Sequence, residues 1–198
     1  MDSFRRPPPA AAAALLLPVI LTVWAVSYGQ VSTAPPETGR TGIPAIVLQM
    51  PLSDADKSYL GLTGNGSFSL PVIHAQVLII EVFSLYCSLC HREADGCNRL
   101  YSAIEADPGL RGRIKVLGIG AGNNPAEAAA FKAKNRVAFP VFHDRTAAVM
   151  KQLGVSVTPS FVCCRIGPNG TLQHLFTVSG PLGSPAAFLR RVRACSGL

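Results

Sequence analysis

The feature that most constrains this chain is a short apolar run followed at once by two cysteines. Residues 76–83 read QVLIIEVF, an unbroken β-rich segment of the kind that forms a strand covered on both faces. Cys87 and Cys90 follow, and from Ser88 to Asp107 the apolar residues recur with the spacing of a helix. The pattern therefore predicts a pair of thiols at the junction between a buried strand and the start of a helix.

This junction favours a particular thiol chemistry. Backbone N–H groups and the dipole at the N-terminus of a helix stabilise an anion, so Cys87 becomes a thiolate that can act as a nucleophile near neutral pH. Cys90 is three residues further on, faces the same way and can resolve a mixed disulfide. The placement favours a redox dithiol, although the same Cys-x-x-Cys core also occurs in haem and zinc sites.

The rest of the chain alternates between strand and helix patterns. Asn65-Gly66 marks a hairpin turn before the run at 76–83. Strand patterns follow over residues 113–122, 160–167 and 172–180, and helix patterns follow over residues 124–136, 144–154 and 184–195. This order predicts an α/β fold in which helices flank a mixed central sheet, with an extra hairpin on the N-terminal side.

The first residues have the pattern of a targeting segment. Arg5 and Arg6 precede an apolar run over 10–26, and Ala25-Val26-Ser27 offers a small-x-small cleavage site. The run is a little shorter than the roughly 20 residues that span a bilayer, so a cleaved signal peptide and an uncleaved signal anchor both stay open. In the second case residues 10–26 would hold the protein at the membrane. The expected organisation is a leader over 1–29, a linker over 30–42 and one domain over 43–198.

The expected export affects how the composition is interpreted. Six cysteines in a periplasmic or otherwise extracytoplasmic domain favour disulfide chemistry. The chain is 48% hydrophobic and 15% charged, which allows a packed core and argues against general disorder. The net charge is +7, but the basic residues are scattered instead of clustered with stacking aromatic residues, so no nucleic-acid surface is expected.

A second motif lies further along the chain. Thr158-Pro159, within VTPSF, stands just before a predicted strand and is a candidate cis peptide bond. With EVFSLYCSLC at 81–90 and Gly180 at the end of the last predicted strand, it makes the chain resemble the thioredoxin superfamily over residues 43–194. The leader and the extra hairpin make it most similar to the TlpA-like exported thiol-disulfide oxidoreductases. The resemblance implies a three-layer thioredoxin-like fold and an enzyme without cofactor or metal, with protein thiols and an upstream redox protein as partners.

The resemblance also implies roles for the matching residues. Cys87 would be the attacking thiol and Cys90 the resolving thiol, and the two would form the redox disulfide. Pro159 would be the cis-proline that packs against them. Thr158 would offer its backbone to the substrate chain.

Glu81 and Tyr86 complete the expected site. Glu81 stands six residues before Cys87, where thioredoxins carry a buried acid, and it would relay the proton of Cys90. A structural ion pair of Glu81 with a Lys or Arg is an equally open interpretation. Tyr86 stands where the family usually has Trp and would contact the substrate, and Ser88-Leu89 replaces the usual inner pair. Both departures affect the reduction potential and leave the chemistry in place.

Two metal-centred interpretations of the dithiol remain. The segment from Cys87 to His91 matches the attachment motif of c-type haem, although cytochromes c are helical and their motif does not follow a buried strand. A zinc site would need Cys97 to join the pair. Cys97 lies two helical turns from Cys90, so the ligands would converge poorly.

Two further interpretations keep the fold and change the function. A peroxiredoxin-like thiol peroxidase would use Ser84 as the hydroxyl before Cys87, but Ile80 stands where that pattern has proline. A non-catalytic thioredoxin scaffold would bind a partner or a metal through the same surface. The remaining cysteines are expected to be small core residues: Cys97, Cys163, Cys164 and Cys195.

Overall fold

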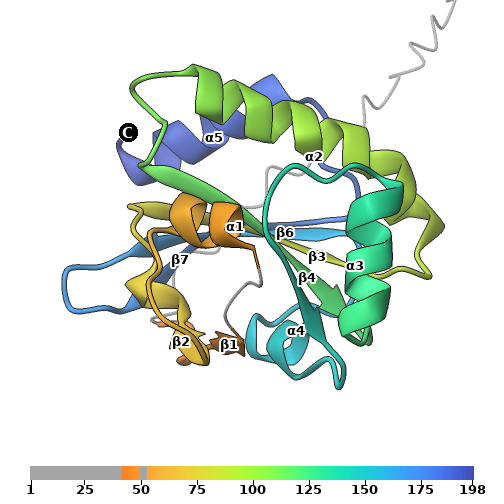
Figure 1. The fold of residues 1–198 in the computed structure, drawn as a ribbon. Coiled ribbons are helices and arrows are strands. Elements are labelled where there is room, and N and C mark those ends of the chain that lie inside the picture. The colour runs from red at the N-terminus through yellow and green to blue at the C-terminus, as the bar shows by residue number, and fades with distance from the viewer. Residues whose placement is uncertain (1–41, 50–52) are drawn as a thin grey trace, which may run out of the picture. The chain divides into compact units, whose positions relative to one another are not determined.

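The structure is a computed structural model that describes residues 42–49 and 53–198 (Figure 1). The predicted leader, and the predicted linker up to residue 41, lie outside the described residues. A five-stranded sheet with the strand order β5-β4-β3-β6-β7 forms the centre of the described domain. Its strands are β3 (Val77–Phe83), β4 (Ile114–Ala121), β5 (Val141–Asp144), β6 (Ser160–Ile166) and β7 (Leu172–Ser179).

The sheet is mixed, as the sequence predicts. Strand β4 pairs in parallel with β3 and β5, whereas β6 pairs in antiparallel with β3 and β7. Parallel neighbours need a crossover connection, and two helices provide it. Helix α2 (Ser88–Ala106) connects β3 to β4, and helix α3 (Pro125–Lys134) connects β4 to β5.

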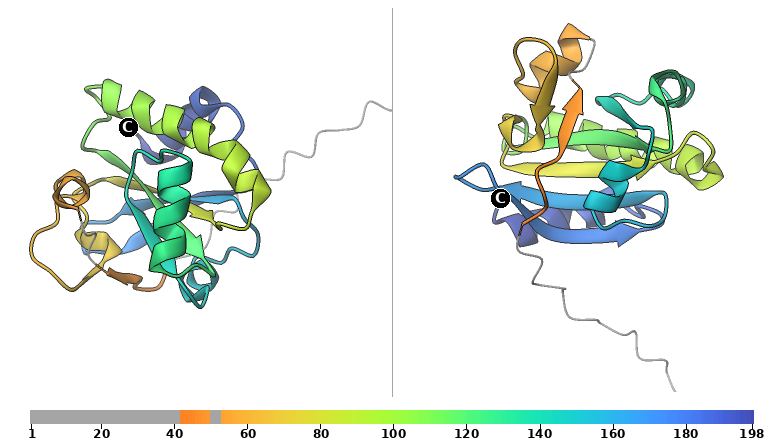
Figure 2. Two further views of the ribbon diagram at one scale, coloured as in Figure 1. Left: turned by 45° about the vertical axis from the view of Figure 1, so that its right-hand side comes forward. Right: turned by 90° about the horizontal axis from the view of Figure 1, so that it is seen from below.

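The elements form three layers, which confirms the predicted fold class. Helices α2 and α5 (Pro185–Ser196) pack together on one face of the sheet (Figure 1). On the other face, β1 (Val47–Gln49) and α4 (Ala148–Gln152) lie across the sheet, and α1 (Asp54–Leu60) lies beside the edge of β4, as the view from below in Figure 2 shows.

Strand β3 is the centre of both halves of the core. All seven of its residues are buried, which confirms the predicted strand covered on both faces. Its even-numbered residues from Leu78 to Val82 join the hydrophobic cluster under the N-terminal strands, and its odd-numbered apolar residues join the cluster under α2 and α5. Glu81 is the polar exception in this strand, and it is on the face toward α2.

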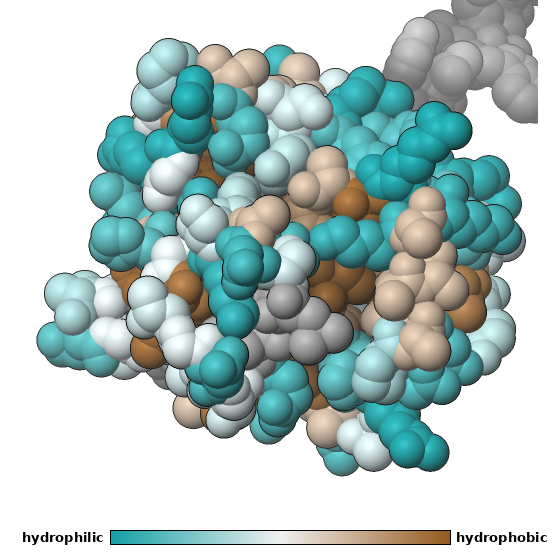
Figure 3. Space-filling model, in the orientation of Figure 1, coloured by the Kyte–Doolittle hydropathy of each residue, from teal (hydrophilic) through white to brown (hydrophobic). Residues whose placement is uncertain are grey.

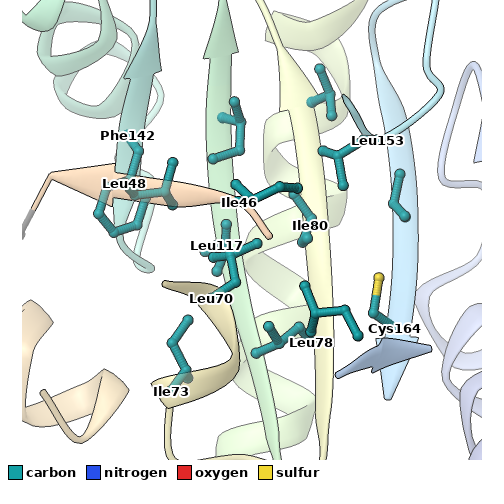
Figure 4. Close-up of a cluster of buried hydrophobic side chains, with 14 of the residues drawn as sticks. Ile46, Leu48, Leu70, Ile73, Leu78, Ile80, Leu117, Phe142, Leu153 and Cys164 are labelled. Carbon is teal, nitrogen blue, oxygen red and sulfur yellow. The ribbon is translucent and has the colours of Figure 1, made fainter. Parts of the chain in front are cut away.

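The N-terminal extension closes the face opposite α2. Ile46 and Leu48 from the β1 segment lie over Ile80 and Leu117 of the central strands (Figure 4). Strands β1 (Val47–Gln49) and β2 (Ser67–Ser69) form a separate two-stranded antiparallel sheet, as the predicted hairpin requires. The hairpin turn predicted at Asn65-Gly66 is wrong, however, because this pair forms a bend just before β2 and helix α1 lies between the two paired strands in the chain.

The sequence analysis missed α1 and β5, and both are short. Helix α1 has seven residues, and its local markers are Ser53, whose hydroxyl oxygen accepts a hydrogen bond from Asp56 N at 2.9 Å, and Gly61, which ends the helix in the left-handed conformation. Strand β5 has four residues at the edge of the sheet, and only its last residue, Asp144, overlaps the helix predicted over 144–154. The observed helix there is shorter, since Asp144 ends β5 and α4 begins at Ala148.

The outer surface of the described domain is mostly hydrophilic. Hydrophilic side chains cover most of the face seen in Figure 3. The large hydrophobic side chains that stay exposed among the described residues are Val47, Val72, Tyr86 and Val157. Within residues 42–49 and 53–198, no helix combines the length and the apolar character needed to cross a membrane.

Candidate active site

Cys87 lies where the sequence places it, between strand β3 and helix α2. It is the N-cap residue of α2, and its sulfur accepts a hydrogen bond from Cys90 N at 3.1 Å. The turn from β3 is closed by Cys87 N, which donates to the carbonyl of Ser84 at 3.1 Å. The predicted strand–dithiol–helix junction is therefore confirmed, and the first turn of α2 directs a backbone N–H toward the Cys87 sulfur.

The loop before Cys87 is held by Asn123, which the sequence analysis did not single out, and by His91, which it considered only as part of a haem motif. Asn123 is fully buried, and its Oδ1 accepts a hydrogen bond from Leu85 N at 2.8 Å. The Nε2 atom of His91 lies 2.8 Å from the carbonyl oxygen of Leu85, and its Nδ1 lies 3.0 Å from Oδ1 of Asn135. Both backbone polar groups of Leu85 are thus held, which fixes the approach of the chain to the dithiol.

The two thiols differ in environment and in acidity. Partial burial opposes ionisation of Cys87, but hydrogen bonds from the Cys90 thiol and from the backbone of Cys90 and Leu89 leave its pKa below the ordinary value. Cys90 is fully buried, and burial together with the neighbouring Cys87 raises its pKa to about 12. Cys87 is therefore the thiol that ionises first, as an attacking residue must.

The Thr158-Pro159 peptide bond is cis, as the sequence analysis anticipated, and it faces the dithiol. The Cys87 thiol lies 3.4 Å from the carbonyl oxygen of Thr158. The carbonyl of Pro159 accepts a hydrogen bond from Gly180 N at 2.8 Å, which ties the start of β6 to the end of β7. The three features on which the resemblance rests are thereby linked by contacts in space.

Two exposed hydrophobic residues flank Cys87. Tyr86 is 73% exposed and Val157 is 49% exposed, and they belong to the two segments that meet at the dithiol. The Tyr86 hydroxyl donates a hydrogen bond to Oε1 of Glu127 in the first turn of α3. This contact raises the pKa of Tyr86 and lowers the pKa of Glu127. Tyr86 therefore stands at the rim of the site, where a role in substrate contact remains a prediction.

Glu81 is buried beneath the dithiol helix. It is 1% exposed, and in the sheet it lies between Gly118 of β4 and Phe161 of β6. Burial is the main cause that raises its pKa to about 7, and the nearby charge of Glu93 acts in the same direction. Glu81 makes no salt bridge with any described residue, so the interpretation as a structural ion pair is not supported.

The hydrogen bond recorded for Glu81 comes from Cys97, not from Cys90. The sequence analysis expected Cys97 to be a small core residue, and it is buried, but it also contacts this acid. The seven-residue spacing from Cys90 could have indicated a shared helix face. Cys163 and Cys164 are buried as expected, whereas Cys195 is exposed on α5 and the expectation of a core position for it is wrong.

The structure also bears on the metal-centred interpretations. Both ring nitrogens of His91, the residue that would ligate haem iron, are already within hydrogen-bonding distance of protein oxygens. Among the described residues, no group of three or more His, Cys, Asp or Glu side chains is arranged to hold a metal ion. All six cysteines are free thiols in the structure.

The difference in acidity predicts selective alkylation. In the reduced protein, iodoacetamide should modify Cys87 at neutral pH and leave Cys90 unmodified, because only the thiolate reacts and Cys90 has a pKa of about 12. Mass spectrometry of the digested protein over a range of pH values measures both sites, with the exposed Cys195 as internal reference. Equal rates at Cys87 and Cys90 would contradict the assigned order of ionisation.

The raised pKa of Glu81 predicts that Glu81→Gln stabilises the protein in a pH-dependent way. Between pH 4.5 and about 7, Glu81 keeps its proton in the folded protein and loses it in the unfolded chain. The free-energy cost of the buried carboxylate is therefore absent below pH 4.5 and complete above about pH 7. We expect a gain of about 3 kcal/mol at about pH 8 and almost none at about pH 4. Urea unfolding of both proteins at the two pH values measures it, and a loss of stability at the higher pH would mean that the charge is compensated.

Comparisons with known proteins agree with this geometry. A family model described as the AhpC/TSA family matches residues 49–175. No curated protein matches the chain.

Solved structures give matches at the level of the fold. A putative thiol:disulfide interchange protein DsbE from Chlorobium tepidum matches with a TM-score of 0.58 and 17% identity, over 79% of this chain and 96% of that chain. A secreted thiol-disulfide isomerase from Corynebacterium glutamicum gives 0.56 and 18%, over 79% and 86%. StoA from Bacillus subtilis gives 0.54 and 17%, over 75% and 98%. With the matched family model and this fold, the chain belongs to the AhpC/TSA family and is a redoxin of the thioredoxin superfamily.

Proposed function

We propose that the protein is an exported thiol-disulfide oxidoreductase that exchanges disulfides with protein thiols through Cys87 and Cys90. The observation that carries this proposal is the placement of Cys87. Its sulfur caps the N-terminus of α2, is partly exposed, and has a lowered pKa, while the Cys90 thiol lies within hydrogen-bonding reach of it. An accessible thiolate with a buried thiol beside it is the arrangement that dithiol exchange requires.

The reaction in the reducing direction begins with attack by Cys87. Its thiolate attacks one sulfur of a substrate disulfide, a bond forms between the two sulfurs, and the other substrate sulfur leaves as a thiolate that takes a proton from water. Cys90 then loses its proton and attacks the Cys87 sulfur of the mixed disulfide. The Cys87–Cys90 disulfide forms, the second substrate sulfur leaves as a thiolate, and two electrons have passed to the substrate. The oxidising direction is the reverse of these steps.

Removal of the Cys90 proton is the difficult step, because its pKa is about 12 in the reduced protein. Glu81 is a buried carboxylate on β3, the strand whose residues Ile79 and Phe83 share a hydrophobic cluster with Cys90, and its pKa of about 7 suits a group that is partly ionised at neutral pH. We assign Glu81 the role of proton acceptor for Cys90. The thiol that hydrogen-bonds to Glu81 is that of Cys97, so we assign the transfer of the Cys90 proton to a bridging water or to a small movement of either side chain.

The substrate chain is assigned to the surface between the dithiol and the cis-proline. Tyr86 and Val157 provide exposed apolar contacts beside Cys87, and Thr158-Pro159 provides the backbone next to the sulfur. An extended segment of a partly unfolded protein fits such a surface better than a small molecule does, since the exposed groups flank the sulfur without enclosing it.

The competing enzymatic function is that of a peroxiredoxin-like peroxidase. Ile80, at the position where that pattern has proline, is buried in the cluster on the opposite side of the sheet. The hydroxyl oxygen of Ser84, at the hydroxyl position, accepts a hydrogen bond from Tyr86 N at 3.5 Å. A peroxidase assay with hydrogen peroxide is the measurement that separates the two functions.

The dithiol assignment predicts different effects of the two cysteines. Cys87→Ser should lower the rate of insulin reduction by dithiothreitol to that of the reaction without protein, because no thiolate is left to attack. Cys90→Ser should retain the attack and accumulate mixed disulfides, which mass spectrometry detects. Cys195→Ser, at the exposed thiol of α5, is the matched control and should keep full activity. Activity in Cys87→Ser, or hydrogen peroxide turnover without exchange activity, would overturn the proposal.

Export and attachment to the membrane are supported by the leader pattern at residues 1–29. The full chain with a C-terminal tag should therefore appear in the extracytoplasmic fraction of a bacterial host, and a chain that begins at residue 30 should stay in the cytoplasm. Release by high salt would indicate a cleaved leader, whereas release by detergent alone would indicate an anchor over 10–26. Recovery of the full chain in the cytoplasm would contradict export.

A further inference from the structure

Cys97 belongs to a buried group of ionisable side chains that the dithiol reaction as described does not use. It lies on α2, two turns after Cys90 and on the same side of the helix, and it is 2% exposed. Cys90 and Cys97 belong to the same hydrophobic cluster, over the face of β3 that carries Glu81. This thiol has no reactive role of its own, because burial raises its pKa well above the ordinary value.

Glu81 has few polar neighbours in this layer. The titratable residues of α2 that act on Glu81 are Glu93 and Cys97, and Oε2 of Glu93 accepts a hydrogen bond from Leu182 N at 3.0 Å. In the sheet, the residues paired with Glu81 are Gly118 and Phe161, and the titratable Cys163 is two residues further along β6, opposite Ile79. From α5 the contributions to the cluster are the apolar residues Phe188 and Val192.

The carboxylate of Glu81 is therefore poorly compensated. Its Oε1 atom is buried and has no hydrogen-bond partner among the described residues, and the nearby charge of Glu93 is of the same sign. The recorded hydrogen bond to Glu81 comes from the Cys97 side chain. A thiol is a weak donor, but a hydrogen bond to a buried anion gains strength where little water competes for it.

We propose that Cys97 is a positioning residue for the exchange reaction, in which its S–H group holds the Glu81 carboxylate and keeps it ionised for the Cys90 proton. This inference rests on the proposed function of the dithiol. Without the donor, Glu81 would keep its proton to higher pH and would accept the proton of Cys90 less readily. The resolving step would then need more alkaline conditions, while the first attack by Cys87 would be unchanged.

The direct test is a titration of the Glu81 carboxyl group. In protein labelled with ¹³C at glutamate carboxyls, with Glu81→Gln for assignment, the midpoint should move upward by roughly half to one pH unit in Cys97→Ala. Cys97→Ser replaces S–H by an O–H donor of similar reach and should keep the midpoint at or below that of the wild type. Cys164→Ala removes an equally buried thiol from the other face of the sheet and should not move it. This readout does not depend on exchange activity.

The kinetic test follows the resolving step. The midpoint of its pH profile, measured from decay of the mixed disulfide, should rise in Cys97→Ala, return in Cys97→Ser, and be unaffected by Cys97→Ala when Glu81→Gln is already present. Unchanged Glu81 titration in Cys97→Ala, or equal shifts in the Ala and Ser variants, would overturn the inference. A wild-type protein without exchange activity would instead overturn the proposed function, and the carboxyl titration would still decide whether Cys97 holds Glu81.

Discussion

The coverage of strand β3 on both faces is the constraint on which the rest of the structure depends. A strand packed between two clusters cannot slip by one residue, because each of its side chains would then meet the wrong face. The end of the strand at Phe83 is thereby fixed, and so is the point at which the chain leaves the sheet. The start of helix α2 follows from it, since Asn123 and His91 hold the intervening backbone at Leu85. The reactive sulfur is positioned by packing that lies mostly outside the site.

The same burial sets the electrostatics of the site. An acid on β3 has to lose its water, and its pKa rises because the neutral form is favoured in such surroundings. A cysteine at the first turn of α2 stays partly in water and meets backbone N–H groups, so its pKa falls. The strand thus raises the pKa of Glu81 and the helix lowers the pKa of Cys87. Opposite shifts of this kind bring an acid and a nucleophile into their reactive protonation states at the same pH.

Much of this arrangement could be predicted from the sequence, because it is encoded locally. The run at 76–83, the cysteine spacing and the Thr158-Pro159 pair each indicate their own conformation, and their order specifies the fold class. Elements with little local encoding were missed. Helix α1 and strand β5 are short and depend on contacts with the sheet more than on their own pattern.

The parts of the site that depend on long-range contacts were also missed. Asn123 is separated from Leu85 by 38 residues. Its position between a predicted strand and a predicted helix indicated only a connecting residue. Cys97 was assigned to the core on composition, which is correct for its burial and incomplete for its hydrogen bond. Residue type predicted the burial of Cys97, Cys163 and Cys164, although it failed for Cys195. The partner that a buried side chain meets depends on how two distant segments pack.

The contact between Tyr86 and Glu127 has a consequence for the mobility of the site's rim. One oxygen of Glu127 receives the Tyr86 hydroxyl, and the other receives the backbone N–H of Asn124 in the capping box of α3. The carboxylate is thus anchored to a helix end and cannot follow the ring if the ring swings outward. The Tyr86 ring is therefore held in place in the protein without substrate, although most of its surface is exposed to solvent. Any substrate that needs the ring elsewhere must first break this one hydrogen bond, and the capping of α3 survives the change.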